Sequence, residues 1–360
     1  MAKVTTMFVS DNQSGVAPEV VEALAAAAQK SHGSYGGDDL TAELTARFRD
    51  IFETDLAVFT VPTGTAANAL ALSAVAPSYG AVLCTADAHV MADECGAIEN
   101  ATGGARLEVP EAGPKLTAVV IDRHLSLPRD VHVVQPAAIT IAQATERGLA
   151  YQPAEIEALG EVARRHAVHF HMDGARFANA VAALNAAPAD ITWRAGVDTL
   201  SFGGTKNGCF AAEAVIVFNL DLARQIEFRR KQRGHLFSKN WFVSAQFLAS
   251  LTDDRWLKWA ANANAQAASL AEEIETSGLG RLIWPVEANE IFVEIAETKL
   301  RALTDAGITL SEWPDTTLPV GSSLPAGAKL VRLVTSFSTS KADVEQFIQL
   351  VATIGSEGMT

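Results

Sequence analysis

The sequence predicts an α/β protein with a mostly parallel sheet covered by helices on both faces, followed by a small α+β domain. Between residues 56 and 218, short apolar runs rich in Val, Ile and Ala alternate with amphipathic helix patterns. Strands that are apolar throughout are typical of parallel sheets whose two faces are both buried. Long helix patterns and a second alternation of strands and helices follow. We therefore expect a large domain over residues 1–255 and a small domain over residues 256–360.

The elements are expected in the following order. A helix begins at Pro18, a residue that suits the first turn, and a second helix over 41–52 carries Leu44 and Phe48 at helical spacing. Helices are also expected at Pro153–His166 and 177–182. The small domain is expected to hold strands at 290–295 and 329–336 and a last helix from Lys341. Seven strands are expected in the large domain, at residues 56–61, 81–84, 118–121, 138–141, 168–171, 199–202 and 214–218.

The net charge and the cysteines exclude several classes of function. The chain has 28 Lys and Arg against 42 Asp and Glu, a net charge of −14. This balance does not favour nucleic acids or anionic membranes as partners. The three cysteines lack CxxC spacing, which argues against a disulfide framework and against a zinc site. From these cysteines we expect no metal site. The N-terminus lacks the pattern of a signal peptide, so we expect a cytoplasmic enzyme.

Four polar segments follow expected strands or lie just beyond them. They are PTGT at 62–65, ADAHVMADE at 86–94, MDGAR at 172–176 and SFGGTK at 201–206. Ligands of open α/β sheets bind beyond the carboxyl ends of the strands. We therefore expect these four segments to converge on one site.

Asp173 and Lys206 suit opposite ends of one cofactor, pyridoxal 5′-phosphate (PLP). Asp173 follows a buried strand, where a carboxylate is costly without a cationic partner, and it would accept the pyridinium N–H. Lys206 would form the Schiff base, with Gly174 and the pair Gly203-Gly204 leaving room for a flat ring. Two alternatives stay open at this point. Asp173 could form a structural ion pair with Arg176, and Lys206 could be a solvated surface residue.

Two further segments suit the same cofactor. Thr63-Gly64-Thr65 precedes a helix, whose first N–H groups and dipole, together with two hydroxyls, would bind a phosphate; the alternative is an ordinary threonine-capped helix. His89 lies just beyond the strand at 81–84, where its ring could stack on PLP and act as a base on a substrate hydroxyl. The remaining histidines considered are expected to be capping, surface or core residues: His124, His132, His169, His171 and His235.

Together these segments resemble the low-specificity L-threonine aldolases, including their phenylserine-aldolase-like members, which are PLP enzymes of fold type I. The resemblance implies cleavage of L-threonine, L-allo-threonine and related β-hydroxy-α-amino acids to glycine and an aldehyde. It runs nearly end to end, through FVSDNQSGVAPEV, SYGGDDLT, PTGTAANALAL, DAHVMADECGAIENATGGARL, IAQATERG, HMDGARFANA, SFGGTKNG and VRLVTSF.

The resemblance implies roles for individual residues of the cofactor site. Lys206 matches the Schiff-base lysine, Asp173 the pyridinium partner and His89 the ring-stacking histidine. Gly64 and Thr65 match the turn that cradles the phosphate.

The resemblance also implies substrate and subunit contacts. Arg176 belongs to both the cofactor site and the substrate site. Lys239 or Arg233 is similar to a residue that reaches the phosphate of a neighbouring subunit, and Tyr35 resembles an interface tyrosine near the active site. A homotetramer, a dimer of dimers with shared active sites, is therefore expected. The residues that resemble the ligands of the substrate carboxylate are Ser10, Arg176 and Arg332.

The chain departs from the family at one position, and other functions stay open. Thr145-Glu146 stands where some relatives carry a second histidine near the substrate hydroxyl, so the residue that discriminates threo from erythro substrates is open. A preference for phenylserine, or β-elimination or transamination on the same fold, is an alternative. A non-catalytic nucleotide- or phosphate-binding protein is disfavoured, because neither G-x-x-x-x-G-K-[ST] nor a strand-linked G-x-G-x-x-G is present.

Overall fold

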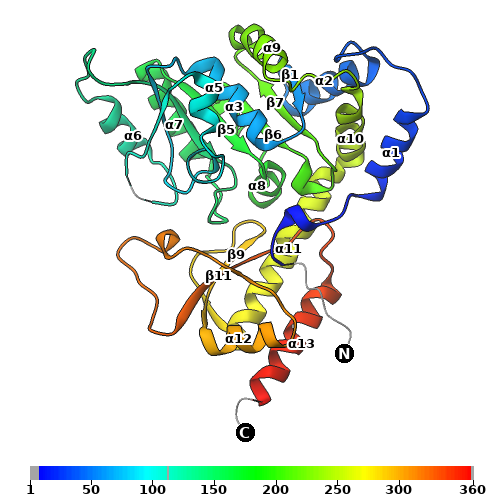
Figure 1. Cartoon of the computed structure of the whole chain (residues 1–360), viewed down its shortest axis with the longest axis vertical. Coiled ribbons are helices and arrows are strands. Elements are labelled where there is room, and N and C mark those ends of the chain that lie inside the picture. The colour runs from blue at the N-terminus through cyan, green and yellow to red at the C-terminus, as the bar shows by residue number, and fades with distance from the viewer. Residues whose placement is uncertain (1–7, 112, 358–360) are drawn as a thin grey trace.

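The computed structural model describes residues 8–111 and 113–357 and contains two sheets in separate parts of the molecule (Figure 1). The larger sheet consists of β1 (Ala57–Val61), β2 (Gly80–Leu83), β3 (Arg106–Glu108), β4 (Gln135–Ala142), β5 (His169–Gly174), β6 (Thr199–Gly203) and β7 (Glu213–Val217). Their order is β1-β7-β6-β5-β4-β2-β3. Neighbours from β6 to β3 run parallel, whereas β7 is antiparallel to both β1 and β6. The predicted seven-stranded, mostly parallel sheet is confirmed.

Helices cover both faces of this sheet, because successive side chains of a strand point to opposite faces and both sets are apolar. On β7, Val215 and Val217 pack with α3 (Gly64–Val75) and α9 (Ala223–Gln232), whereas Ala214 and Ile216 face the opposite core. The short helix α5 (Ala97–Thr102) packs on α3. The opposite core is covered by α1 (Pro18–Ala28), α2 (Asp39–Phe52), α7 (Pro153–His166), α8 (Phe177–Leu184) and α10 (Trp241–Leu251).

One expected strand was wrong. Residues 118–121 lie in α6 (Ala118–Leu125), where the hydroxyl of the N-cap Thr117 accepts from the N–H of Val120 and only Ile121 is buried. A short apolar run does not distinguish a strand from a helix by periodicity alone. The seventh strand is β3 instead, a three-residue edge strand that is too short and too exposed to produce an apolar run.

The second sheet is antiparallel, in the order β10-β11-β9-β8, and has a core of its own. The long helix α11 (Arg255–Thr276) joins the two parts, with Trp256 and Ala260 in the first core and Leu270 and Ile274 in the second. Among the described helices, none is long and apolar enough to cross a membrane. The other elements of this part are β8 (Gly280–Leu282), β9 (Glu290–Ala296), α12 (Glu297–Asp305), β10 (Ser311–Glu312), β11 (Ala328–Val334) and α13 (Lys341–Glu357).

The N-terminal segment crosses from the small sheet to the large one. The carbonyl of Phe8 accepts from the N–H of Val334 on β11 at 2.8 Å, and the ring of Phe8 packs edge-on against Phe347. The short 3-10 helix η1 (Asp11–Gln13) follows directly. Asp11 is therefore held at the junction of the two parts, next to α8 and β9.

Candidate active site

The four polar segments singled out in the sequence meet in one cavity of about 300 Å³. The cavity lies beyond the carboxyl ends of β5 and β6 and at the start of α3, as expected for an open α/β sheet. Among the residues described by the structure, no group of His, Cys, Asp and Glu side chains is arranged to hold a metal ion. The side chains that line the cavity come from Asn12, Pro62, Thr63, Gly64, Thr65, Asn68, His89, Asp93, Glu94, Asp173, Ala175, Thr205, Lys206 and Glu213.

One end of the cavity is formed by the start of α3. The hydroxyl of Thr63, the N-cap, accepts from the N–H of Ala66 at 3.2 Å, so the ordinary capping interaction is present. Gly64 and Thr65 are the first two helical residues, and the space around Gly64 is open. The first N–H groups of a helix have no partner within the helix and attract anions. This end therefore suits a phosphate, and capping and phosphate binding are compatible here.

Asp173 is a buried carboxylate that lines the cavity at the end of β5, within hydrogen-bond distance of α3. One carboxylate oxygen accepts from Asn68 Nδ2 at 2.8 Å and the other from the N–H of Ala175 at 3.0 Å. Burial alone would raise the pKa of Asp173, but the charge of His89 and these hydrogen bonds outweigh burial and lower it. Asp173 is therefore ionised at neutral pH. The alternative ion pair with Arg176 is not formed, because Arg176 binds Asp11 instead.

Lys206 lies in the 3-10 helix η3 (Thr205–Asn207) directly after β6, and it is half-buried in the cavity wall. It is therefore not a solvated surface lysine. Beside it, Glu213 at the start of β7 is buried, and burial raises its pKa to about 7 against the opposing effects of Thr205 and Lys206. A Glu at the head of the apolar strand EAVIV was a signal for this residue that the sequence interpretation missed.

The glycines around Asp173 and Lys206 serve the protein's own packing. A Cβ on Gly174 would lie 2.6 Å from Leu200 Cδ1, and one on Gly203 would lie 2.5 Å from the carbonyl oxygen of Ala175. A Cβ on Gly204 would lie 2.8 Å from the carbonyl oxygen of Ala212. A side chain at these positions would therefore collide with neighbouring protein atoms, and the room that the glycines leave for a flat ligand stays a prediction.

His89 opens the short helix α4 (His89–Ala92) and faces the cavity. Its backbone N–H donates to Glu146 Oε1 at 3.1 Å, and its Nδ1 lies 3.5 Å from the same oxygen. Burial would lower the pKa of His89, but the hydrogen bond and charge of Glu146 outweigh it and raise the pKa. Glu146, noted in the sequence only as a departure from the family, is thus placed directly behind the expected base.

The three expected ligands of the substrate carboxylate lie near one another at the junction of the two sheets. Arg176 forms a bidentate pair with Asp11, from Nε to Oδ2 at 2.7 Å and from Nη2 to Oδ1 at 3.0 Å. Its Nη1 lies 3.2 Å from Glu290 Oε2, and Arg332 Nη1 lies 3.3 Å from Glu290 Oε1. Ser10, which caps η1, precedes Asp11.

These arginines differ in how many of their donors are engaged. Arg176 uses three nitrogens on Asp11 and Glu290, whereas Arg332 uses one on Glu290 and stacks 3.8 Å over the ring of Trp313. Arg332 therefore has a salt bridge within its own chain, and it keeps donors for a further anion. Asp11, with a pKa that Arg176 and Lys206 lower to about 2 against the effect of burial, stays ionised.

The residues expected at a subunit boundary lie apart from the cavity. Tyr35 is half exposed, with the amine of Lys231 4.5 Å from its ring centre, and Lys239 is exposed. Arg233 lines a neighbouring cavity of about 710 Å³ that shares Thr63, Thr65 and Glu94 with the first. Arg233 thus approaches the start of α3 within its own chain.

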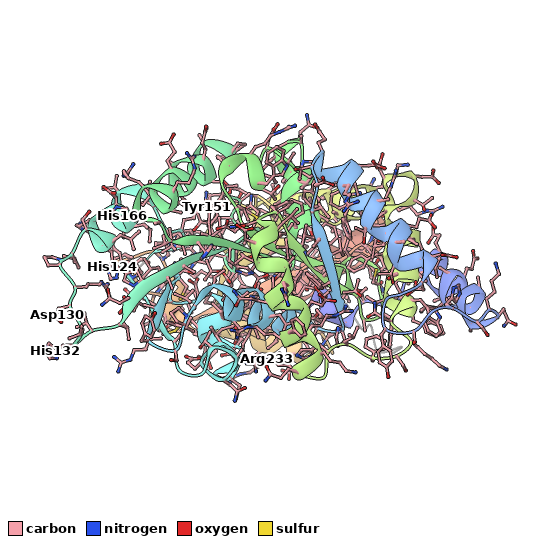
Figure 2. The ribbon with its side chains drawn as sticks, turned by 90° about the horizontal axis from the view of Figure 1, so that it is seen from above. His124, Asp130, His132, Tyr151, His166 and Arg233 are labelled. Carbon is pink, nitrogen blue, oxygen red and sulfur yellow. The ribbon has the colours of Figure 1, made fainter. Side chains whose placement is uncertain are left out.

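The remaining histidines do not line the cavity of Asp173 and Lys206, whereas His235 lines the neighbouring cavity beside Arg233. In Figure 2, His124, His132 and His166 lie toward one end of the molecule, well away from Arg233. His171 lies in the core between Thr140 Oγ1 at 2.8 Å and Ser201 Oγ at 3.1 Å, and burial lowers its pKa to about 4. It is a satisfied neutral core histidine, as expected.

Comparisons with known proteins identify the family. The family model described as beta-eliminating lyase matches residues 8–298. The chain is 45% identical to the low specificity L-threonine aldolase of Pseudomonas aeruginosa, over 84% of this chain and 88% of that protein. It is 43% identical to the same enzyme of another Pseudomonas strain, over 85% and 89%.

The fold comparison agrees with the sequence comparison. The threonine aldolase structure of Leishmania major superimposes with a TM-score of 0.88 at 28% identity, covering 97% of this chain and 99% of that one. A serine palmitoyltransferase of Sphingomonas wittichii matches with a TM-score of 0.71 at 14% identity, which shows the shared fold alone. The chain belongs to the beta-eliminating lyase family and, within it, to the low-specificity L-threonine aldolases, carbon–carbon lyases of fold type I that depend on PLP.

Proposed function

We propose that this protein cleaves L-threonine, L-allo-threonine and related β-hydroxy-α-amino acids to glycine and an aldehyde. The observation that carries the proposal is that the ionised Asp173, Lys206 and the start of α3 all line one cavity. Family membership supports the same reaction, since the relatives named above are low-specificity L-threonine aldolases.

The residues of the cavity fit PLP. The N–H groups and hydroxyls at Gly64 and Thr65 would hold its phosphate, and Asp173 would accept its ring N–H because Asn68 and Ala175 keep this carboxylate ionised. Lys206 would attach its aldehyde carbon. When bound, PLP supplies an electron sink for the bond that breaks at the substrate's Cα.

His89 is the residue expected to accept the proton of the substrate's β-hydroxyl. Among the histidines considered, this residue is the one that lines the cavity together with Asp173 and Lys206. We propose that the neutral imidazole of His89, or a water that it orders, takes this proton. Because the pKa of His89 is raised, its neutral form becomes available at higher pH than that of an ordinary histidine.

The substrate's α-carboxylate would be held at the junction of the two sheets. Arg332 keeps donors beyond its contact with Glu290, and Arg176 is fixed beside it by Asp11 and Glu290. We propose that Arg332 provides the charge-assisted hydrogen bonds, with Arg176 and Ser10 completing the subsite. A carboxylate fixed there would set the direction of the Cα–Cβ bond relative to the cofactor.

β-Elimination and transamination are the second candidate functions, favoured by the description of the family model as beta-eliminating lyase. Both reactions break the Cα–H bond, so Lys206 would act as the base. Purified protein loaded with PLP is incubated with L-threonine, L-allo-threonine and phenylserine, and the products are separated. Glycine and aldehyde in equal amounts support aldol cleavage. A 2-oxo acid, with ammonia from elimination or with the amino form of the cofactor from transamination, contradicts it.

We further propose a cytoplasmic homotetramer, a dimer of dimers whose active sites are shared. The support is that Tyr35 and Lys239 are exposed and do not line the cavity of their own chain. The exposed rings of Phe210 and Phe228 also suit burial in an interface. Light scattering coupled to gel filtration is expected to give four chains. A fully active monomer would contradict this assembly.

A further inference from the structure

We propose that Glu146 is the positioning residue of His89: it fixes the ring so that Nε2 faces the cavity, and its carboxylate stabilises the protonated ring. This inference rests on the proposed aldol cleavage and deepens it, because it assigns the group that makes His89 a base of defined orientation. The relevant contact involves a single carboxylate oxygen, Glu146 Oε1, shared by the backbone and the ring of His89.

The geometry places Glu146 behind His89 as seen from the cavity. His89 lines the cavity and Glu146 does not. The N–H of His89 donates to Glu146 Oε1 at 3.1 Å, and Nδ1 of the same residue lies 3.5 Å from that oxygen. Because Nδ1 faces the carboxylate, Nε2 is the ring nitrogen left for a substrate. A carboxylate in this place selects the tautomer and the ring orientation of a histidine base.

Glu146 is buried in a hydrogen-bonded segment, and its ion-pair contact among the described residues is with His89. Its side chain is 9% exposed, and it lies in the tight segment after β4, where the Thr145 hydroxyl accepts from the N–H groups of Arg147 and Leu149. The neighbouring Arg147 is paired with Asp87. Among the described residues, His89 is thus the cation within ion-pair distance of Glu146.

The surrounding charges determine what removal of Glu146 would do. Burial and the positive charge of Lys206 both lower the pKa of His89, whereas Glu146 and, more weakly, Asp173 raise it. Without the Glu146 charge the lowering effects prevail, so the neutral imidazole exists at more acidic pH. Charged groups from several elements surround this pair. The carboxyl groups are Asp87 before α4, Glu94 beyond α4 and Asp173 at the end of β5. The cations are Arg147 after β4, Arg176 after β5 and Lys206 in η3.

The test compares the pH dependence of kcat/KM for the wild-type holoenzyme, Glu146→Gln and Glu146→Asp. In Glu146→Gln, which keeps the shape and an acceptor but loses the charge, the acidic limb is expected to move to lower pH by about one unit. Turnover at the optimum is expected to fall several-fold, because the ring is less well oriented. Glu146→Asp keeps the charge and should retain the wild-type limb with a reduced kcat.

Two further readouts separate positioning from general damage. Glycine lacks the β-hydroxyl, so its binding, followed by the absorbance of the bound cofactor, should change less than twofold in Glu146→Gln. In ¹⁵N-histidine NMR spectra of the holoenzyme, the titration midpoint of His89 should fall in the same variant; this readout does not depend on which reaction is catalysed. Asp122→Asn, which removes the carboxylate 2.8 Å from the distant His166, is the matched control and should change neither.

An acidic limb and a His89 titration that stay in place in Glu146→Gln would overturn the proposal. So would loss of glycine binding in parallel with kcat, which would make Glu146 a structural residue. If the wild-type protein forms no glycine from L-threonine, the proposed function fails, and the NMR titration still decides whether Glu146 controls His89.

Discussion

The side-chain amide of Asn68 donates to Asp173 at 2.8 Å and to Glu94 at 3.0 Å, and all three residues line the cavity. One amide group thus separates two buried carboxyl groups. Burial, with the charge of Asp173 adding to it, raises the pKa of Glu94 to about 7, so below neutral pH Glu94 is protonated while Asp173 stays ionised. Asn68 is buried in the largely apolar helix α3, where these two contacts satisfy its amide N–H groups.

Asn68→Ala is expected to weaken PLP binding by about tenfold, because Asp173 loses a hydrogen bond that keeps it ionised, a loss of roughly 1–3 kcal/mol. The measurement is the dissociation constant of PLP by absorbance titration of cofactor-stripped protein. Asn179→Ala removes a buried amide that pairs with Asn264 outside the cavity and should bind PLP as the wild type does. Equal affinity for PLP in Asn68→Ala and wild type would show that Asp173 needs no support from α3.

Arg332→Leu is expected to leave PLP bound and to weaken glycine binding by about 3 kcal/mol, the scale of a lost charge-assisted pair. Glu290 keeps Arg176 as a partner in this variant, so the fold should tolerate the change. Titration of the cofactor absorbance with glycine gives the affinity. Unchanged glycine affinity would mean that Arg332 only balances Glu290.

Arg176→Leu is expected to damage the fold more than Arg332→Leu does. It leaves the buried Asp11 without its bidentate partner and removes one of the two arginines at Glu290, a change that costs about 3–5 kcal/mol when a buried charge is stranded. Urea unfolding of both variants, without glycine, measures the difference. Similar unfolding midpoints for the two variants would contradict the central position of Arg176 in this network.

His171 is expected to add a pH-dependent term to stability. Its pKa is lowered to about 4 in the folded protein, so between about pH 6.5 and 4 the unfolded chain binds a proton that the folded chain excludes. The stability that His171 contributes is therefore complete above pH 6.5 and is lost as the pH falls. The gap in unfolding free energy between wild type and His171→Gln should shrink by about 2–3 kcal/mol from pH 7.5 to pH 4.5. A gap that is constant with pH would contradict a neutral buried His171.

The sequence predicted the elements and residues whose signal is local. Continuous apolar strands with polar residues at their carboxyl ends placed Asp173, Lys206 and His89 in one cavity. The strand predicted at 118–121 was wrong, because a run of four apolar residues suits a helix as well as a strand. The exposed strand β3 was not predicted. The domain boundary placed between residues 255 and 256 stays a prediction.

Partners from distant segments were beyond sequence reasoning. The pairing of Arg176 with Asp11 spans 165 positions, and that of His89 with Glu146 spans 57. The local sequence does not predict which carboxylate pairs with which cation, because the pairing depends on how η1 and the segment after β4 pack against the sheet. The reason for Gly174 and Gly203 was likewise hidden, since it lies in contacts with neighbouring backbone and side chains.

The central claim is that Lys206 attaches PLP in the cavity where the substrate's Cα–Cβ bond is cleaved. The most direct measurement is borohydride reduction of the holoenzyme, followed by peptide mapping and by an assay of glycine and aldehyde from L-threonine with wild type and Lys206→Ala. We predict that the reduced cofactor is found on Lys206, and that Lys206→Ala neither retains borohydride-fixed cofactor nor releases glycine. Cofactor fixed to another lysine, or glycine formation that survives in Lys206→Ala, would contradict the account.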